Sequence, residues 1–236
     1  MRVLAVPVAF NEEKKIGRVL DRFTSGLVDA VVVVDDGSTD STARVAEERG
    51  VRVISHEQRK GVGCAIRTGI RHAQSNGYGV IVIMAGNDKD RPSDIARLTR
   101  AIERDGYDFV QGSRYLEGGK HGQMPLYRRL ATGMLHPWLF SLLVRRRITD
   151  STNGFRAIRL AMLEDPRIDL DQDWLEHYEL EPYLFFKAIR LGYRVTEVPV
   201  TKIYPPKELG YTKMKPITGW WSILRPIFLL GLGLRK

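Results

Sequence analysis

Two carboxylates stand where a strongly apolar run ends. Asp35 and Asp36 directly follow four valines at positions 31–34 and precede Gly37. A run of β-branched residues predicts a strand that is covered on both faces of a sheet. Carboxylates at the carboxyl end of such a strand lie where open α/β sheets bind ligands, and they are suited to accept hydrogen bonds from a ribose or a base. The alternative is that both aspartates only cap the next helix.

A second acidic group follows the apolar run Val80–Met84. The chain continues there with Ala85-Gly86-Asn87-Asp88-Lys89-Asp90. Asp88 and Asp90 are two residues apart, a spacing at which two carboxylates can share a hard divalent cation. The alternative is a solvated turn ahead of the helix that begins near Pro92.

Strands and helices alternate along the chain and place both acidic groups at one edge of a sheet. Apolar runs predict strands at Arg2–Val8, Val31–Val34, Val51–Ser55, Val80–Met84, Asp108–Gln111 and Tyr193–Val198. Apolar residues at helical spacing predict helices from about Asn11 and over Ser41–Arg49, Cys64–Ser75, Ser93–Arg104, Leu126–Val144 and Leu180–Leu191. This alternation predicts an α/β fold with a doubly wound, mostly parallel sheet, Rossmann-like in its first half.

Composition excludes several classes of protein. Hydrophobic residues make up 43% of the 236 residues, which permits a sizeable core and excludes a disordered chain. The net charge of +9 favours anionic partners such as nucleotide phosphates or a membrane surface. Because the basic residues are spread along the chain without interleaved aromatic residues, we expect no nucleic-acid partner. The single cysteine, Cys64, cannot form an internal disulfide and fits a reducing compartment.

The C-terminal segment is the most apolar part of the chain. Neither a signal peptide nor an apolar stretch long enough to span a membrane is found, so the sequence predicts a cytoplasmic protein. Residues 217–234 combine Trp220 and Trp221 with aliphatic residues and are followed by Arg235 and Lys236. This composition is typical of an interfacial helix, here peripheral on the cytoplasmic face of an anionic membrane. Two alternatives remain: the segment packs on the domain as core, or it forms a homodimer contact.

Five segments resemble, in order, the motifs of a known enzyme family. They are Phe10-Asn11-Glu12-Glu13, Val34-Asp35-Asp36-Gly37-Ser38-Thr39-Asp40, Gly112-Ser113-Arg114-Tyr115, Asp150-Ser151-Thr152-Asn153-Gly154-Phe155-Arg156, and Glu197-Val198-Pro199-Val200 with Gly210-Tyr211-Thr212-Lys213. On these motifs the chain resembles a GT-A glycosyltransferase of the large inverting family that includes dolichyl- and polyprenyl-phosphate sugar synthases. The resemblance covers residues 2–215.

The resemblance implies a domain organisation and an activity. A GT-A domain would occupy residues 1–215, with a nucleotide-sugar half at 1–112 and an acceptor half at 113–215, followed by a tail at 216–236. Such an enzyme transfers a hexose from a UDP- or GDP-linked sugar to an acceptor, for example a polyprenyl phosphate, with inversion at C1. The alternative is a non-catalytic nucleotide-binding module of the same fold.

The resemblance also implies roles for individual residues. The residues assigned to donor binding are Val8, Phe10 and Glu12 around the base, Val34 and Asp36 at the next strand end, Gly86 and Asn87 after the fourth strand, and Arg114 and Lys213 near the pyrophosphate. A cation near the pyrophosphate stabilises the charge that grows on the leaving nucleoside diphosphate. A hydroxyl acceptor needs a catalytic base, for which the candidates are Asp150, Glu179 and Glu181, whereas a phosphate acceptor is already anionic and needs none.

The chain departs from the family's metal-binding motif. The family ends its fourth strand in Asp-x-Asp, which binds Mg²⁺ or Mn²⁺, whereas this chain has Ala85-Gly86-Asn87 there. We expect Asp88 or Asp90 to hold the Mg²⁺ or Mn²⁺ ion instead. The alternatives are weakened use of metal and direct replacement of the ion by the ammonium group of Lys89.

Overall fold

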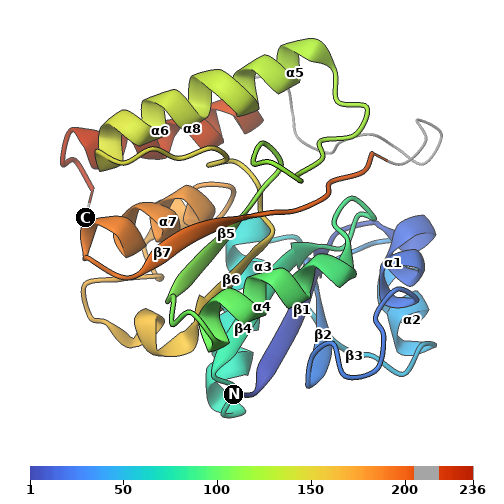
Figure 1. Ribbon diagram of the computed structural model, residues 1–236. Helices are drawn as coiled ribbons and strands as arrows, with labels where there is room; N and C mark the ends of the chain where they lie inside the picture. Colours follow the sequence, from blue (N-terminus) through green and yellow to red (C-terminus); the bar gives the residue numbers. More distant parts are fainter. Residues whose placement is uncertain (205–217, 236) are drawn as a thin grey trace.

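One seven-stranded sheet forms the centre of the protein (Figure 1), whose computed structural model describes residues 1–204 and 218–235. The strands are β1 (Val3–Ala9), β2 (Ala30–Asp35), β3 (Arg52–Ser55), β4 (Val80–Ala85), β5 (Phe109–Ser113), β6 (Arg156–Arg159) and β7 (Val195–Pro199). Their order is β3-β2-β1-β4-β6-β5-β7, and of these strands only β6 runs antiparallel to its neighbours. The predicted α/β fold with a doubly wound, mostly parallel sheet is confirmed, although β6 was not among the expected strands.

Helices cover both faces of this sheet. They are α1 (Glu13–Leu20), α2 (Thr42–Glu47), α3 (Val62–Ser75), α4 (Ile95–Glu103), α5 (Leu126–Leu130), α6 (His136–Val144), α7 (Leu180–Arg190) and α8 (Thr218–Gly231), with short helical turns η1 (Pro92–Asp94), η2 (Ala131–Leu135), η3 (Leu160–Glu164) and η4 (Asp173–Leu175). Side chains alternate along β1: Leu4 and Val6 join the core cluster of α3 and α7, whereas Val3 and Ala5 join that of α4. Burial on both faces explains why the strands read as continuous apolar runs.

A glycine at the end of β2 allows two loops to pack closely together. Gly37 has a φ of +72°, and a Cβ atom there would lie 2.3 Å from the backbone carbon of Gln58. Only glycine fits this left-handed, crowded position without a shift of the backbone. The loop before α3 is thereby held against the carboxyl end of β2, where the first pair of aspartates lies.

A further helical layer packs on α7. Helices α5, η2 and α6 continue one another over residues 126–144, as predicted, and end at Arg145, which has a left-handed φ of 53°. α8 contacts both α6 and α7 (Figure 1). Ile223, Ile227 and Leu230 are buried, so the C-terminal helix contributes to the core by one side. This arrangement favours the interpretation in which the segment packs on the domain.

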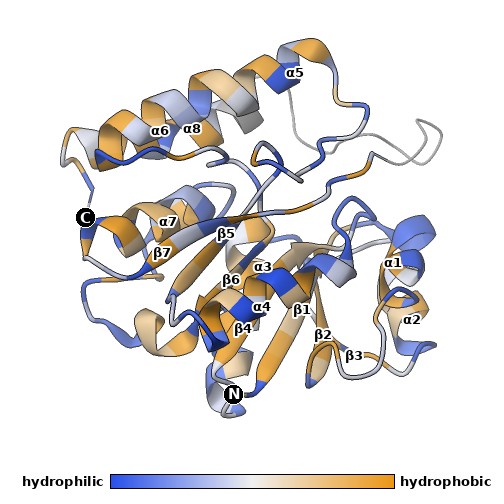
Figure 2. Ribbon diagram, in the orientation of Figure 1, coloured by the Kyte–Doolittle hydropathy of each residue, from blue (hydrophilic) through white to orange (hydrophobic). Residues whose placement is uncertain are grey.

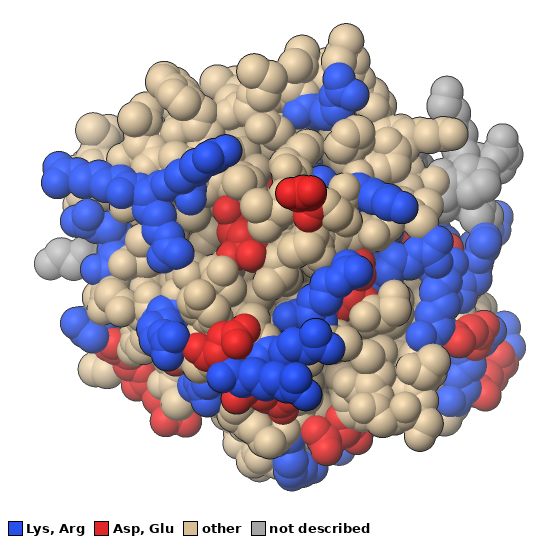
Figure 3. Space-filling view, viewed as in Figure 1, with Lys and Arg blue, Asp and Glu red and all other residues tan. Residues whose placement is uncertain are grey.

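Large apolar side chains of this layer are exposed, and Figure 2 shows many residues of α5 and α6 in the orange of hydrophobic residues. The exposed ones are Leu126, Tyr127, Leu130, Met134, Leu135, Trp138, Leu142, Trp221, Phe228, Leu232 and Leu234. In the space-filling view the surface over α5 and α6 bears few charged side chains (Figure 3). Within the described residues, no helix is both long enough and apolar enough to cross a membrane. The boundaries of the two halves, the cytoplasmic location and the membrane contact stay predictions.

Candidate active site

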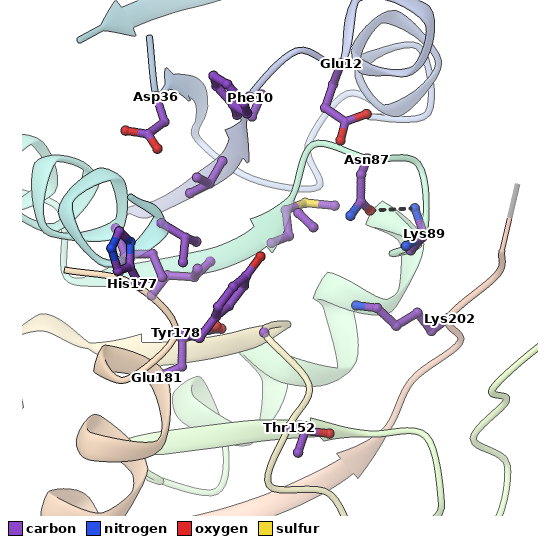
Figure 4. A pocket seen from close by; sticks show the side chains of 18 of the residues that line it. Phe10, Glu12, Asp36, Asn87, Lys89, Thr152, His177, Tyr178, Glu181 and Lys202 are labelled. Atoms are coloured by element: carbon purple, nitrogen blue, oxygen red, sulfur yellow. Dashed lines mark hydrogen bonds between the residues drawn. The ribbon is translucent and has the colours of Figure 1, made fainter. Parts of the chain in front are cut away.

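A pocket of about 440 Å³ lies at the carboxyl edge of the sheet (Figure 4). β1 and β4 pair in parallel and end beside each other there, with Val8 opposite Ala85. β2 and β3 lie on one side of β1 and β4 lies on the other, so this edge is the switch point at which doubly wound sheets bind ligands. The outer helical layer closes a further side, because Arg128, Thr132 and Ile223 line the pocket.

Asp36 lines this pocket and is 3% exposed. Its carboxylate accepts hydrogen bonds of 2.9 Å from the backbone N–H groups of Lys60 and Gly61. It also lies 3.0 Å from Nδ1 of His56. The carboxylate therefore anchors the loop before α3 to the end of β2, in addition to facing the pocket. Its contact with a base or ribose stays a prediction.

Phe10 supplies a flat apolar surface at the end of β1. The guanidinium carbon of Arg59 lies over the ring, 4.3 Å from its centroid. Phe10, Arg59 and Val8 all line the pocket. Planar groups stack well on aromatic rings and guanidinium planes, so this end of the pocket suits a nucleotide base.

Two residues assigned to donor binding lie in the protein interior instead. Val34 is 0% exposed and belongs to the core cluster of α3, because alternation along β2 turns its side chain into that layer. At Gly86 a Cβ atom would lie 3.0 Å from the Cβ of Ala9 and 3.1 Å from Cδ1 of Ile16, so the backbone passes tightly between its neighbours. Neither residue lines the pocket, so the structure gives no geometric support for their direct contact with the donor, which stays a prediction.

The carboxylates of Asp88 and Asp90 both form ion pairs with cationic side chains of the protein. Asp88 has a left-handed φ of 62°, and its carboxylate, which does not line the pocket, forms ion pairs with Arg22 and Arg18 of α1. Asp90 is 1% exposed; it accepts the N–H of Ala85 at 3.0 Å and pairs with Nζ of Lys202 at 2.6 Å. Among the described residues, no three His, Cys, Asp or Glu side chains gather closely enough to hold a metal ion.

Cations occupy the side of the pocket where β4 ends. Figure 4 shows Asn87, Lys89 and Lys202 on this side, across the pocket from Asp36. Lys89 is 7% exposed, and its pKa is lowered to about 7, first by burial and then by the charges of Lys202, Arg128 and Lys15. A divalent cation would meet ammonium groups here, and the oxygen atoms near it would be the amide oxygen of Asn87 and the carboxylate of Glu12, which already pairs with Lys15. The residues present therefore do not fit the Mg²⁺ or Mn²⁺ ion that the family motif implies.

Glu12 lies at the border of this cationic side. It is 6% exposed, lines the pocket and forms an ion pair with Lys15 one turn further along α1. Its backbone N–H donates to Oγ1 of Thr42 at 2.7 Å, which fixes the start of α1 against α2. The carboxylate therefore balances part of the positive charge, and its predicted contact with a base stays untested.

Arg114 is held in place by Asp150. Asp150 is 0% exposed; its carboxylate accepts Nε of Arg114 at 2.7 Å, Nη2 at 2.8 Å and the backbone N–H at 3.0 Å. The neighbouring carboxylate of Glu197 accepts the backbone N–H groups of Thr149 and Asp150 at 2.8 Å each. Arg114 lines the pocket, whereas Asp150 does not. The structure thus gives Asp150 a positioning role and offers no geometric support for its use as a base.

The other two candidate bases differ in their access to the pocket. Glu179 is 3% exposed, lies outside the pocket lining and accepts Nη2 of Arg225, from α8, at 2.9 Å. Glu181 lines the pocket and lies 3.3 Å from Nη2 of Arg156. Burial raises the pKa of Glu181, an effect opposed by Arg156 and Lys202. Of the three predicted carboxylates, only Glu181 reaches the pocket.

Several lining residues were not identified from the sequence. They include Lys15, Arg128, Thr132, Thr152, Arg156, His177, Tyr178, Lys202 and Tyr204. Thr152 and Arg156 lie inside the segment Asp150–Arg156, whose resemblance to a family motif could have identified them as site residues. Lys202 lies shortly after the Val-Pro-Val segment, and nothing local distinguishes it from other basic residues there. Lys213, which was assigned to the pyrophosphate, lies outside the described residues.

Comparison with known proteins identifies relatives that match most of the chain. Residues 5–165 match the family "Glycosyl transferase family 2". The chain is 34% identical over 222 residues to an undecaprenyl-phosphate mannosyltransferase of Micrococcus luteus, with 91% of this chain and 88% of that protein covered. It is 32% identical over 220 residues to a polyprenol monophosphomannose synthase of Mycolicibacterium smegmatis, with 90% and 81% covered.

The fold is also found among solved structures. Glucosyl-3-phosphoglycerate synthase from Mycobacterium tuberculosis, in complex with Mn²⁺, UDP and glucosyl-3-phosphoglycerate, superposes with a TM-score of 0.70 at 21% identity, covering 98% of this chain and 79% of that chain. This likeness concerns the fold, whereas the family match and the two relatives concern the sequence as well. The predicted GT-A fold and enzymatic activity are confirmed, and the non-catalytic alternative is set aside. The chain belongs to glycosyl transferase family 2 and is a glycosyltransferase.

Proposed function

We propose that this enzyme transfers a sugar from a UDP- or GDP-linked donor to a polyprenyl phosphate. The donor would lie along the pocket from its aromatic end to its cationic end. The ring of Phe10 and the loop that Asp36 anchors would hold the nucleoside, and the cations beside Asn87 would hold the diphosphate. Eight lysine and arginine residues and five carboxylates are found among the described lining residues, so the pocket as a whole favours an anionic ligand.

The observation that carries the choice of acceptor is the composition of the outer helical layer. Its helices contribute Arg128, Thr132 and Ile223 to the pocket and expose large apolar side chains on their outer side. One surface of the protein thus leads from apolar side chains to a cation at the pocket. A polyprenyl phosphate has the matching chemistry, since its chain is apolar and its head group is a phosphate. Both named relatives act on polyprenyl phosphates or polyprenols, according to their names.

The same surface supports peripheral contact with a membrane. Trp138, Leu142 and Trp221 are exposed on neighbouring helices, and the basic residues 145–147 follow α6. Exposed tryptophans next to aliphatic residues and arginines are typical of surfaces that lie in the interface of an anionic membrane. In this proposal the enzyme takes its lipid acceptor from the cytoplasmic face of the membrane.

The reaction would be a direct displacement at C1 of the sugar. An oxygen of the acceptor phosphate forms a bond to C1 while the bond from C1 to the diphosphate oxygen breaks, and attack from the opposite side inverts the configuration. The acceptor oxygen already carries negative charge, so no proton has to be removed. This agrees with a pocket in which Asp150 and Glu179 do not reach the reaction space. Glu181 would instead accept a hydrogen bond from a sugar hydroxyl, and the cations would stabilise the departing nucleoside diphosphate.

A transfer assay with matched lipids tests this proposal. The purified enzyme is incubated with radiolabelled UDP- or GDP-linked hexoses and either undecaprenyl phosphate or undecaprenol, and the lipid product is extracted and counted. We expect label in the lipid fraction with the phosphate and none with the alcohol, for donors of one nucleotide class. Transfer to the alcohol, or transfer only to soluble acceptors with no label on undecaprenyl phosphate, would contradict the assigned acceptor.

A further inference from the structure

The family resemblance implies an Asp-x-Asp metal site at the end of β4, but this chain has no carboxylate in that position. The residues in that position are Ala85, Gly86 and Asn87. The two carboxylates that follow in the chain are turned elsewhere: Asp88 to the arginines of α1, and Asp90 to the N–H of Ala85 and to Lys202. Binding a metal through either aspartate would break an ion pair that the fold already makes. Such a break is costly for buried groups.

The fold places positively charged side chains around the end of β4. Lys15 from α1, Lys89 after β4 and Lys202 after β7 come from segments far apart in the sequence and line one pocket. Lys15 and Lys89 are 6% and 7% exposed. Arg128 from α5 adds a fourth cation to the lining. Gathering buried cations costs free energy through mutual repulsion and loss of hydration. Glu12 offsets part of this cost for Lys15 and Asp90 for Lys202, and a bound anion would offset more of it.

The backbone around Lys89 is fixed from several directions. Its N–H donates to Oδ1 of Asn87 at 3.3 Å, and its carbonyl oxygen accepts the N–H of Ile203 at 2.8 Å. The ammonium group lies 5.0 Å from the ring centroid of Tyr204, which also lines the pocket. The hydrogen bond to Ile203 ties the end of β4 to the segment that carries Lys202. The two lysines are therefore held on the same side of the pocket (Figure 4).

We propose that Lys89, together with Lys202 and Lys15, binds the diphosphate of the donor in place of a divalent metal ion. This inference rests on the proposed function, because it takes a nucleoside-diphosphate sugar as the donor. Ammonium groups make short, charge-assisted hydrogen bonds to phosphate oxygens. Their positive charge can stabilise the departing diphosphate in the way that a bound metal ion would. The enzyme is thus a metal-independent member of its family.

Calorimetric titration of UDP and GDP tests the inference. Each nucleotide is titrated into the full-length protein in EDTA, in MgCl₂ and in MnCl₂. We expect one nucleotide to bind with affinities that agree within about twofold in all three buffers. Lys89→Met keeps the length of the side chain and removes its charge, and it should weaken binding in EDTA at least tenfold, as loss of a charge-assisted hydrogen bond does. The matched control is Lys187→Met on α7, outside the pocket lining, which should bind like the wild type.

A second variant keeps the test decisive if Lys89→Met binds too weakly to measure. Asn87→Asp/Lys89→Met places a carboxylate at the pocket and removes the ammonium group. It should regain binding in MnCl₂ and not in EDTA, and thermal unfolding should show that both variants are folded.

Three results would overturn the inference. Wild-type binding that requires Mg²⁺ or Mn²⁺ would show that a metal is used, and would leave the proposed function intact. Unchanged affinity of Lys89→Met in EDTA would place the diphosphate elsewhere. Absence of binding for both nucleotides in every buffer would overturn the donor site itself, and the inference with it.

Discussion

Replacement of Asp150 by asparagine separates a positioning role from a catalytic one. In the wild type the buried carboxylate accepts three hydrogen bonds from Arg114, two of them from the guanidinium group. Asp150→Asn preserves the volume but turns an N–H donor toward the donors of Arg114. Arg114, 5% exposed, is then left as a buried cation without its counterion.

The expected cost follows from the burial of this pair. Removing one partner of a buried, hydrogen-bonded ion pair destabilises a protein by roughly 3–5 kcal/mol. Because asparagine keeps one acceptor oxygen, we expect the lower end, a loss of about 3 kcal/mol in the free energy of unfolding. For a chain of this size about 1 kcal/mol corresponds to roughly 2–4 °C, so the melting temperature should fall by about 6–12 °C.

Urea denaturation followed by circular dichroism measures this loss, with unchanged m-values as a check that the two-state analysis holds. The control is Glu48→Gln, which removes an exposed ion pair with Arg44 and should leave the unfolding curve nearly unchanged. A loss below about 1 kcal/mol for Asp150→Asn would refute the reasoning from burial. A transfer rate that collapses while the stability stays at the wild-type level would instead support a direct catalytic role.

Three further variants test other parts of the structure. Asp36→Ala should keep the fold and weaken nucleotide binding in calorimetry at least tenfold, since both the pocket carboxylate and the loop anchored through Gly61 are lost, and wild-type affinity would remove this residue from the site. Burial raises the pKa of Glu181 above its usual value of about 4.5. Between pH 4.5 and the pKa of the folded state, the folded protein binds more protons than the unfolded protein. The stability of the wild type should therefore fall as the pH rises through this range. Glu181→Gln should lack this decline, and parallel stability curves for the two proteins between pH 4 and pH 8 would contradict a raised pKa of Glu181. Trp138→Ser/Trp221→Ser should reduce co-sedimentation with anionic liposomes severalfold, and a wild type that never sediments would exclude the membrane contact.

The fold was readable from the sequence because its signals are local. Four valines before the aspartate pair and the apolar run before Ala85 form strands of the covered sheet, and short apolar runs of this kind are typical of strands buried on both faces. β6 was missed because Arg156–Arg159 alternates charged and apolar residues in only four positions. Its place between β4 and β5 depends on pairings with strands far away in the chain.

The site was only partly predictable, because the direction of a side chain at a strand end is set by distant partners. Val8, Phe10 and Asp36, which the family resemblance assigns to the donor, line the pocket, and their contact with the donor stays a prediction. Asp88 adopts a left-handed φ and turns toward Arg22, 66 residues earlier in the chain. The spacing of residues in the segment after β4 could not predict this orientation of Asp88. The same holds for the cations that gather from three segments around Asn87.

Direct transfer of a sugar to a lipid phosphate, in a pocket whose own cations receive the departing diphosphate, can be tested in one experiment. The measurement is proton and phosphorus NMR of the lipid product formed in EDTA from an α-linked donor and undecaprenyl phosphate. We expect a β-linked sugar phosphate, because one displacement at C1 inverts the configuration. An α-linked product, or no product until Mg²⁺ or Mn²⁺ is added, would contradict this mechanism.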